Sequence, residues 1–310
     1  MHVMAGVMLD AQGRVLLAQR PPGKHLAGLW EFPGGKLEPD ELPAAALARE
    51  LREELGIDAA AGEPLIRVPW CYGERRLLLD AWTVRAWQGE PASLEGQALQ
   101  WAFPASVDFS LLAPADRPIL RALQLPLRYA VTPAEVTLDA FEEWRQRLAT
   151  SLASGQRLIL LRFPQWPVEQ VRKLARQLMP QARALGARLL LSGDVEGARE
   201  LGEGVGVQLK AHQLMEQDER PLPLEQWIGA SCHNAGELSR AAAIADFATL
   251  SPVAPTATHP GQAPLGWAAF QHLVETASLP VYALGGMREE DLAAVRRAGG
   301  QGVAGIRGFW

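Results

Sequence analysis

The chain has 310 residues, 48% of them hydrophobic, which is too long for one small domain and ample for two cores. A net charge of −5 gives no basic footprint for polymeric nucleic acid, and the two distant cysteines exclude a disulfide framework. The first residues lack the pattern of a signal peptide, and no apolar run approaches the about 18 residues of a membrane span, so we expect a cytoplasmic protein without a membrane partner.

Residues 1–125 predict one α/β domain. Strand-like segments at residues 3–9 and 14–19 flank a turn at residues 11–13 and predict a hairpin. Further predicted elements are a helix at residues 44–55, strands at 65–70, 77–87 and 99–103, and a last helix at 115–123.

The helix after residue 43 has clear start and stop signals. Pro43 suits the first turn, where its missing N–H costs nothing, and Gly56 suits a left-handed stop. Leu47, Leu51 and Leu55 recur at spacing four and predict one apolar stripe.

The same helix carries an acidic face. Glu50, Glu53 and Glu54 stand at i, i+3 and i+4, where like charges repel unless a cation lies among them. Carboxylate oxygens are the ligands that Mg²⁺ and Mn²⁺ prefer, and these ions in turn favour phosphate oxygens. The pattern therefore predicts a metal-dependent phosphate site. The alternative is a solvated acidic face beside a core stripe.

The wider spacing resembles the signature of the Nudix hydrolases at every defined position: Gly35, Glu41, Arg49, Glu50, Glu53, Glu54 and Gly56. Residues 25–41 are similar to the MutT subfamily, which hydrolyses oxidised purine nucleoside triphosphates such as 8-oxo-dGTP. The resemblance implies an α/β/α sandwich in which the glutamates and the Gly34 carbonyl bind Mg²⁺ or Mn²⁺. It also implies that Arg49 orients the glutamates and that Glu41 fixes the loop by pairing with a basic group.

Water attack at the β-phosphorus would then release a nucleoside monophosphate and pyrophosphate. In this scheme Glu53 and Glu54 are the principal ligands. Glu50 is either the base that accepts the water proton or a further ligand, and the sequence leaves both open.

The resemblance to MutT extends to base recognition. It implies that Arg20 and His25 lie near the substrate and that Phe32 lies against the base, with its backbone reading the purine edge. Asp116 stands where the subfamily has an asparagine that donates to O6 and accepts from N7–H of 8-oxoguanine. An ionised carboxylate accepts from N7–H but repels O6, whereas a protonated one does both. The alternatives are surface roles for Arg20 and His25 and a helix cap for Asp116.

Residues 129–310 predict a TIM-type (β/α)8 barrel, joined to the first domain by a short stiff segment. Short apolar runs alternate with helical stretches, such as residues 167–185 and 289–298. The predicted strands are residues 129–132, 158–162, 188–192, 205–209, 227–231, 247–250, 281–284 and 302–306.

This half resembles thiamine phosphate synthase in residues 228–234, 250–256 and 283–287. Ser231, His233, Gly285 and Gly286 are the candidate residues for a phosphate-bearing ligand, and tight-turn glycines are the alternative for the last two. The resemblance fails where the family binds its diphosphate and magnesium. Phe163 and Pro164 follow Arg162, the third strand leads into Asp194, and residues 210–213 read Lys-Ala-His-Gln. We therefore expect no synthase activity.

The leading hypothesis is a Nudix pyrophosphohydrolase that removes oxidised purine triphosphates from the nucleotide pool before they reach DNA. A second hypothesis keeps the metal chemistry and changes the substrate to a thiamine or pyrimidine diphosphate. A third makes the barrel a ligand-binding module that regulates or scaffolds the Nudix half.

Overall fold

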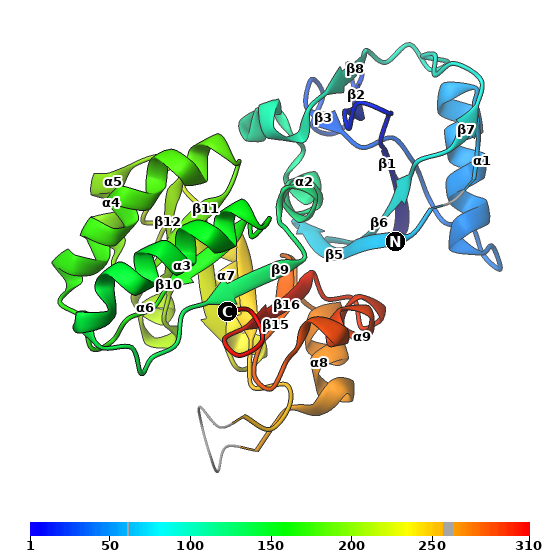
Figure 1. The fold of residues 1–310 in the computed structure, drawn as a ribbon. Helices are drawn as coiled ribbons and strands as arrows, with labels where there is room; N and C mark the ends of the chain where they lie inside the picture. The colour runs from blue at the N-terminus through cyan, green and yellow to red at the C-terminus, as the bar shows by residue number, and fades with distance from the viewer. Residues whose placement is uncertain (61, 257–262) are drawn as a thin grey trace. The chain divides into compact units, whose positions relative to one another are not determined.

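The computed structural model describes residues 1–60, 62–256 and 263–310, which fold as two units, Met1–Gln124 and Leu125–Trp310 (Figure 1). Within these residues, none of the helices has the length and apolar character needed to cross a membrane.

The first unit is a layered α/β structure. Its strands are β1 (His2–Met8), β2 (Val15–Gln19), β3 (Trp30–Glu31), β4 (Asp58–Ala59), β5 (Pro64–Tyr72), β6 (Arg75–Val84), β7 (Trp87–Gln88) and β8 (Leu99–Ala102). They form sheets in the orders β1-β6-β5, β3-β2-β8 and β4-β7. The helical segments are α1 (Pro43–Leu55), η1 (Pro104–Ser106), η2 (Phe109–Leu111), η3 (Pro114–Asp116) and α2 (Arg117–Gln124).

The alternation of side chains along β1 explains the layers. Ala5 and Val7 pack into a core with Ile119 of α2. Met4 and Met8 point the other way, into a core with Leu51 of α1. Because successive strand residues face opposite sides, the two helices cover opposite faces and the unit is an α/β/α sandwich.

The predicted hairpin at the start of the chain is wrong. The turn is present, with the Arg14 carbonyl accepting from the Asp10 N–H at 3.0 Å, but only the bridge between Leu9 and Val15 joins the two strands. β1 pairs in parallel with β6, whereas β2 pairs antiparallel with β3 and β8. β1 is buried on both faces and is hydrogen-bonded to β6 on one side and to the Pro33 and Gly35 carbonyls on the other, so it is not a hairpin arm. The long strand predicted at residues 77–87 is likewise divided into β6 and β7.

Helix α1 follows its sequence signals. Pro43 opens it, and Gly56 closes it with φ of 69° while its N–H donates to the Arg52 carbonyl at 3.0 Å. Leu47, Leu51 and Leu55 are fully buried, so the acidic face is turned away from the core.

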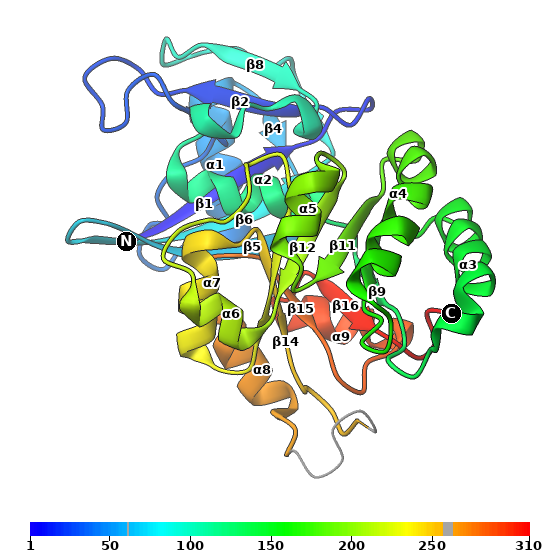
Figure 2. The same cartoon turned by 90° about the vertical axis from the view of Figure 1, so that its left-hand side faces the viewer.

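The second unit is a closed barrel of eight parallel strands, as predicted. Its strands are β9 (Arg128–Val131), β10 (Leu158–Leu161), β11 (Arg188–Ser192), β12 (Val205–Leu209), β13 (Ile228–Cys232), β14 (Phe247–Leu250), β15 (Val281–Ala283) and β16 (Gly302–Gly305). The helical segments η4 (Leu138–Ala140), α3 (Phe141–Ala153), α4 (Val168–Ala184), α5 (Val195–Leu201), α6 (Ala211–Glu216), α7 (Ala235–Ile244), α8 (Gly266–Glu275), η5 (Glu289–Asp291) and α9 (Leu292–Arg297) connect them. Figure 2 shows helices arranged around the outside of these strands.

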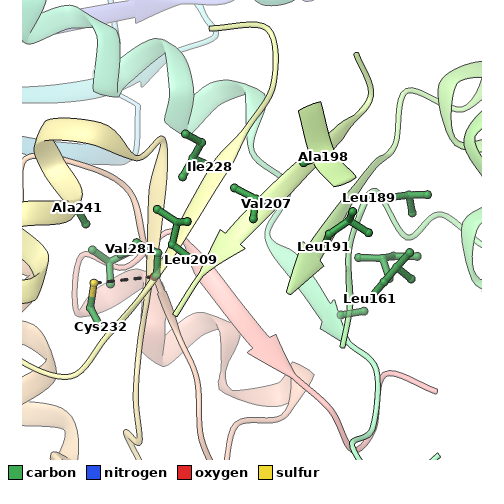
Figure 3. Packing of buried hydrophobic residues seen from close by; sticks show 14 of the residues in the cluster. Leu161, Leu189, Leu191, Ala198, Val207, Leu209, Ile228, Cys232, Ala241 and Val281 are labelled. Carbon is green, nitrogen blue, oxygen red and sulfur yellow. Dashed lines mark hydrogen bonds between the residues drawn. The ribbon is translucent and has the colours of Figure 1, made fainter. Parts of the chain in front are cut away.

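The barrel has an outer and an inner core. Leu161, Leu191 and Val207 face outward and pack with helix residues such as Ala198 and Ala241 (Figure 3). Inside, the rings of Tyr129, Phe247 and Tyr282 lie 5.5–5.6 Å apart and fill the barrel. The interior is therefore packed with side chains, and space for a ligand remains only near the strand ends.

Candidate functional site

The loop at residues 33–35, which contains Gly34 and Gly35, lies between β1 and the acidic face of α1. The Pro33 and Gly35 carbonyls accept from the Gly6 and Met4 N–H groups, each at 2.7 Å. A Cβ on Gly34, whose φ is 146°, would lie 2.2 Å from the Met4 carbonyl oxygen. A Cβ on Gly35 would lie 2.1 Å from Glu50 Oε2. Only glycine at position 34 lets the loop approach β1 so closely, whereas the absence of a side chain at Gly35 leaves room for the Glu50 carboxylate.

Arg49 ties this loop to the helix. Its Nε and Nη2 donate to the two carboxylate oxygens of Glu41, each at 3.0 Å, and Nη2 also donates to the Lys36 carbonyl at 3.0 Å. Nη1 donates to Glu50 Oε1 at 2.9 Å. Hydrogen bonds to both carboxylates raise the pKa of Arg49, so this guanidinium is a permanent cation. The basic partner predicted for Glu41 is thus Arg49 in this structure.

The three glutamates of α1 have different surroundings. Glu54 is the most enclosed, and its Oε2 accepts from the Gly34 N–H at 3.0 Å. Burial, followed by the charges of Glu95, Glu31 and Glu50, raises the pKa of Glu54 to about 8, although the Gly34 N–H opposes this. The Glu53 side chain is 59% exposed and lies 3.4 Å from Arg49 Nη1.

The predicted ligand set of Gly34, Glu50, Glu53 and Glu54 does not converge here. In the part of the chain that the structure describes, no group of three or more acidic, histidine or cysteine side chains is arranged around a metal position. The reason is that Arg49 holds one oxygen of Glu50 while Glu53 extends toward solvent. The chemistry of the donors nevertheless fits a divalent cation, since mutual repulsion among these carboxylates is what such an ion relieves.

A cavity of about 370 Å³ is lined by Glu54, whereas Glu50 and Glu53 are not among its lining residues. It is lined by several of the predicted residues, namely Arg20, His25, Gly34, Glu54 and Asp116. Phe32 lies elsewhere: its ring is 4% exposed and belongs to the core beside α2. Its N–H donates to Asp116 Oδ1 at 2.9 Å. The Phe32 ring is thus taken by the core and its N–H by Asp116, and reading of the purine edge by the Phe32 backbone stays a prediction.

Asp116 is a buried acid rather than a helix cap. Its side chain is bonded to Phe32, 84 residues away, whereas the residue at the cap position of η3 is Ala113. Burial, with a smaller contribution from the charge of Glu31, raises the pKa of Asp116 to about 8. The Phe32 N–H and the Arg20 charge act in the opposite direction. The carboxyl group is therefore mostly neutral near pH 7, with one O–H donor and acceptor capacity remaining.

Arg20 and His25 form one side of the cavity together with residues that the sequence did not single out. Arg20 pairs with Glu31, and its Nε donates to the His25 carbonyl at 2.6 Å. The His25 ring meets the Tyr72 ring edge-on, with centroids 5.1 Å apart, and Tyr72 Oη accepts from the Ala115 N–H at 3.2 Å.

Glu31, Tyr72 and Glu95 are among the residues of this cavity that the sequence analysis did not single out. Tyr72 is the last residue of β5 and Glu31 is the last residue of β3. For these two, a polar or aromatic side chain at the end of a strand is the only feature of the sequence that indicates a place in the site.

The barrel has its own cavity, of about 760 Å³, lined by residues at and just after the carboxyl ends of its strands. Ser231, His233, Gly285 and Gly286 all line it. The His233 Nδ1 lies 2.7 Å from the Ser251 carbonyl oxygen. Gly285 and Gly286 have φ values of 89° and 70°, and a Cβ on either would lie 2.7 Å from the loop at residues 252–255. The two glycines are thus required by a tight turn that borders the cavity.

Comparison with known proteins separates the same two parts. The model of the NUDIX domain family matches residues 4–122, and the model of the thiamine monophosphate synthase family matches residues 128–309. The chain belongs to both families. Its first part is a Nudix domain and its second part is a thiamine monophosphate synthase domain.

Curated relatives agree with this division. The Nudix domain is 45% identical over 132 residues to the CTP pyrophosphohydrolase of Escherichia coli (strain K12), which covers 43% of this chain and 96% of that protein. It is 43% identical over 96 residues to an 8-oxo-dGTP diphosphatase of Proteus vulgaris, and this match covers 31% of this chain and 86% of that protein. The synthase domain is 33% identical over 185 residues to the thiamine-phosphate synthase of Thioalkalivibrio sulfidiphilus (strain HL-EbGR7). This match covers 59% of this chain and 86% of that protein.

Proposed function

We propose that the Nudix domain, residues 1–125, hydrolyses nucleoside triphosphates to the monophosphate and pyrophosphate. We further propose that oxidised purine nucleotides such as 8-oxo-dGTP are its substrates, so that it cleans the nucleotide pool in the cytoplasm. The observation that carries this proposal is the single cavity lined by Glu54 of the acidic helix, by Arg20 and by the buried Asp116. Two relatives of this domain, the CTP pyrophosphohydrolase and the 8-oxo-dGTP diphosphatase, are named for the hydrolysis of nucleoside triphosphates, and they support the proposal.

In this proposal Glu50, Glu53, Glu54 and the Gly34 carbonyl hold Mg²⁺ or Mn²⁺. The cation supplies positive charge that offsets the charge developing on the phosphate oxygens during attack at the β-phosphorus. Arg49 orients Glu50 by holding Oε1, while Oε2 lies against Gly35. The second oxygen would serve either as a ligand of the cation or as the acceptor of the proton from the attacking water. Arg20 and His25 line the same cavity and would contact the substrate there.

Asp116 reads the base. As a neutral acid it offers an O–H donor beside an acceptor oxygen, which matches O6 and N7–H of 8-oxoguanine. Unmodified guanine presents acceptors at both positions, so one of the two hydrogen bonds is lost. The substitution of aspartate for asparagine therefore keeps the selectivity as long as the carboxyl group stays protonated.

A second candidate substrate is CTP. The relative named for CTP hydrolysis is 45% identical to this domain. The edge of cytosine places an N4–H donor beside the N3 acceptor, and a neutral Asp116 can bond to both. The thiamine or pyrimidine diphosphates implied by the barrel remain a third class of substrate.

Initial rates with Mg²⁺ on 8-oxo-dGTP, dGTP, CTP and thiamine diphosphate test these proposals. We expect kcat/KM to be highest for 8-oxo-dGTP, with monophosphate and pyrophosphate as products. A higher kcat/KM for CTP would show that CTP, the second candidate, is the preferred substrate. Preference for thiamine diphosphate would reject both. Glu38→Gln, an exposed acid outside the acidic face, is the matched control for glutamate variants.

For the barrel, residues 129–310, we propose a ligand-binding role without synthase activity. Asp194, the acid nearest the third strand, accepts from Arg172 Nε and Nη2, each at 2.7 Å, and from the Gly197 N–H at 2.9 Å. It is thus committed to the structure of the barrel. Formation of thiamine phosphate from the thiazole phosphate and pyrimidine diphosphate would overturn this proposal. Comparing nucleotide hydrolysis by the whole chain with and without thiamine phosphate tests whether the barrel regulates the Nudix domain.

A further inference from the structure

Tyr72 brings a hydroxyl group to the cavity of the Nudix domain. It is the last residue of β5, and it lines the cavity together with His25, Ala115 and Asp116. The His25 ring meets its ring edge-on with centroids 5.1 Å apart, and the centroid of the Trp70 ring lies 6.3 Å away. Contacts with two other rings hold the phenol in one orientation.

The Tyr72 hydroxyl group accepts a hydrogen bond from the protein but donates none to it. Its Oη accepts from the Ala115 N–H at 3.2 Å. A phenol hydroxyl also has one hydrogen to donate, and among the residues that the structure describes none accepts it. Burial raises the pKa of Tyr72, so the hydroxyl group keeps this hydrogen near neutral pH. The hydrogen is therefore available to a ligand in the cavity.

The carboxyl groups of this part of the cavity have partners of their own. Glu31 pairs with Arg20, and Asp116 Oδ1 accepts from the Phe32 N–H at 2.9 Å. Because Ala115 directly precedes Asp116, the bond from its N–H ties the Tyr72 hydroxyl group to the segment that carries the base-reading acid. The cavity thus has two separate polar groups for one edge of a base, the Asp116 carboxyl group and the Tyr72 hydroxyl group.

One edge of 8-oxoguanine presents three polar groups in a row, O6, N7–H and O8. In the proposed function a neutral Asp116 binds the first two. O8 lies on the other side of N7–H and is a carbonyl oxygen, so it needs a donor. Guanine has an apolar C8–H at that place, and cytosine has no counterpart of it. A donor beside the acceptor oxygen of Asp116 would therefore contact the one atom that oxidation adds to the base.

We propose that Tyr72 is a second specificity-determining residue of the Nudix domain, and that its hydroxyl group donates to O8 of 8-oxoguanine while Asp116 binds O6 and N7–H. The inference rests on the proposed function and adds the atom by which the oxidised base is read. Asp116 detects the hydrogen that oxidation places on N7, and Tyr72 detects the new oxygen. Two hydrogen bonds instead of one then separate 8-oxo-dGTP from dGTP.

Tyr72→Phe in the full chain, which removes only the hydroxyl group, tests this inference in rate assays with Mg²⁺. We expect kcat/KM for 8-oxo-dGTP to fall several-fold, up to about tenfold, while kcat/KM for dGTP changes less than about twofold. CTP, assayed as a substrate or as a competitive inhibitor, should also be unaffected, because it bonds to Asp116 but has no O8. Cys71→Ala, which changes the exposed neighbour of Tyr72 outside the cavity, is the matched control.

Two results would overturn this inference and leave the proposed function intact. One is an unchanged ratio of the kcat/KM values for 8-oxo-dGTP and dGTP in Tyr72→Phe. The other is an equal loss with CTP, which would mean that Tyr72 only positions Asp116 through the Ala115 N–H. A wild-type chain without preference for 8-oxo-dGTP over dGTP would instead reject the proposed function, and this inference with it. Far-ultraviolet circular dichroism of each variant reports whether it remains folded.

Discussion

The protonation of Asp116 gives a prediction with a defined pH range. With a pKa of about 8, the carboxyl group is about 90% neutral at pH 7 and about 10% neutral at pH 9. If only the neutral form donates to O6, kcat/KM for 8-oxo-dGTP should fall roughly tenfold between these pH values. The donor is present below the raised pKa and is lost as the pH rises through it.

Asp116→Asn is the decisive variant. Asparagine keeps an acceptor for the Phe32 N–H and a donor for O6 at every pH, so its kcat/KM should match that of the wild type within about twofold at pH 7. At pH 9 the variant should be several-fold faster. Stopped initial-rate assays from pH 6 to 9.5 with both proteins on the same substrate remove the effect of substrate ionisation. Superimposable pH profiles would refute the assigned role of Asp116.

Three further outcomes are expected. Glu53→Gln and Glu54→Gln should each lower the hydrolysis rate by about two or more orders of magnitude, and near-normal turnover in either variant would reject the assigned metal face. Glu31→Gln should move the alkaline fall in activity to lower pH, since it removes a charge that raises the pKa of Asp116; a shift to higher pH would contradict this. Gly34→Ala should destabilise the domain by about 2 kcal/mol or more in urea unfolding, because its Cβ would overlap a carbonyl of β1; an unchanged midpoint would contradict the assigned contact.

Local signals predicted the parts of the fold that depend on neighbouring residues. The start and stop of α1 follow from Pro43 and Gly56, and the eight barrel strands follow from short apolar runs in regular alternation. The pairing of β1 with β6, some seventy residues apart, has no local signal, because both a hairpin arm and a central strand show apolar runs.

The same limit applies to the sites. The family resemblance implied a basic partner for Glu41 without naming it, and the structure identifies that partner as Arg49. The contacts of Phe32 with Asp116 and of Glu31 with Arg20 join separate elements, so tertiary packing decides them. That Asp194 is engaged by Arg172 also depends on how α4 packs beside β11 and could not be read from the sequence.

The closure of the barrel has a consequence for how the chain is made. β9, the first strand of the barrel, pairs with β16, the last, through residues 128–130 and 303–305. During synthesis β9 therefore has an open edge until nearly the whole barrel has left the ribosome, and open edges invite pairing with other chains. The sandwich of residues 1–124 has all its strands much earlier. A ribosome that stalls before residue 302 would thus release a chain with a complete first fold and an aggregation-prone second one.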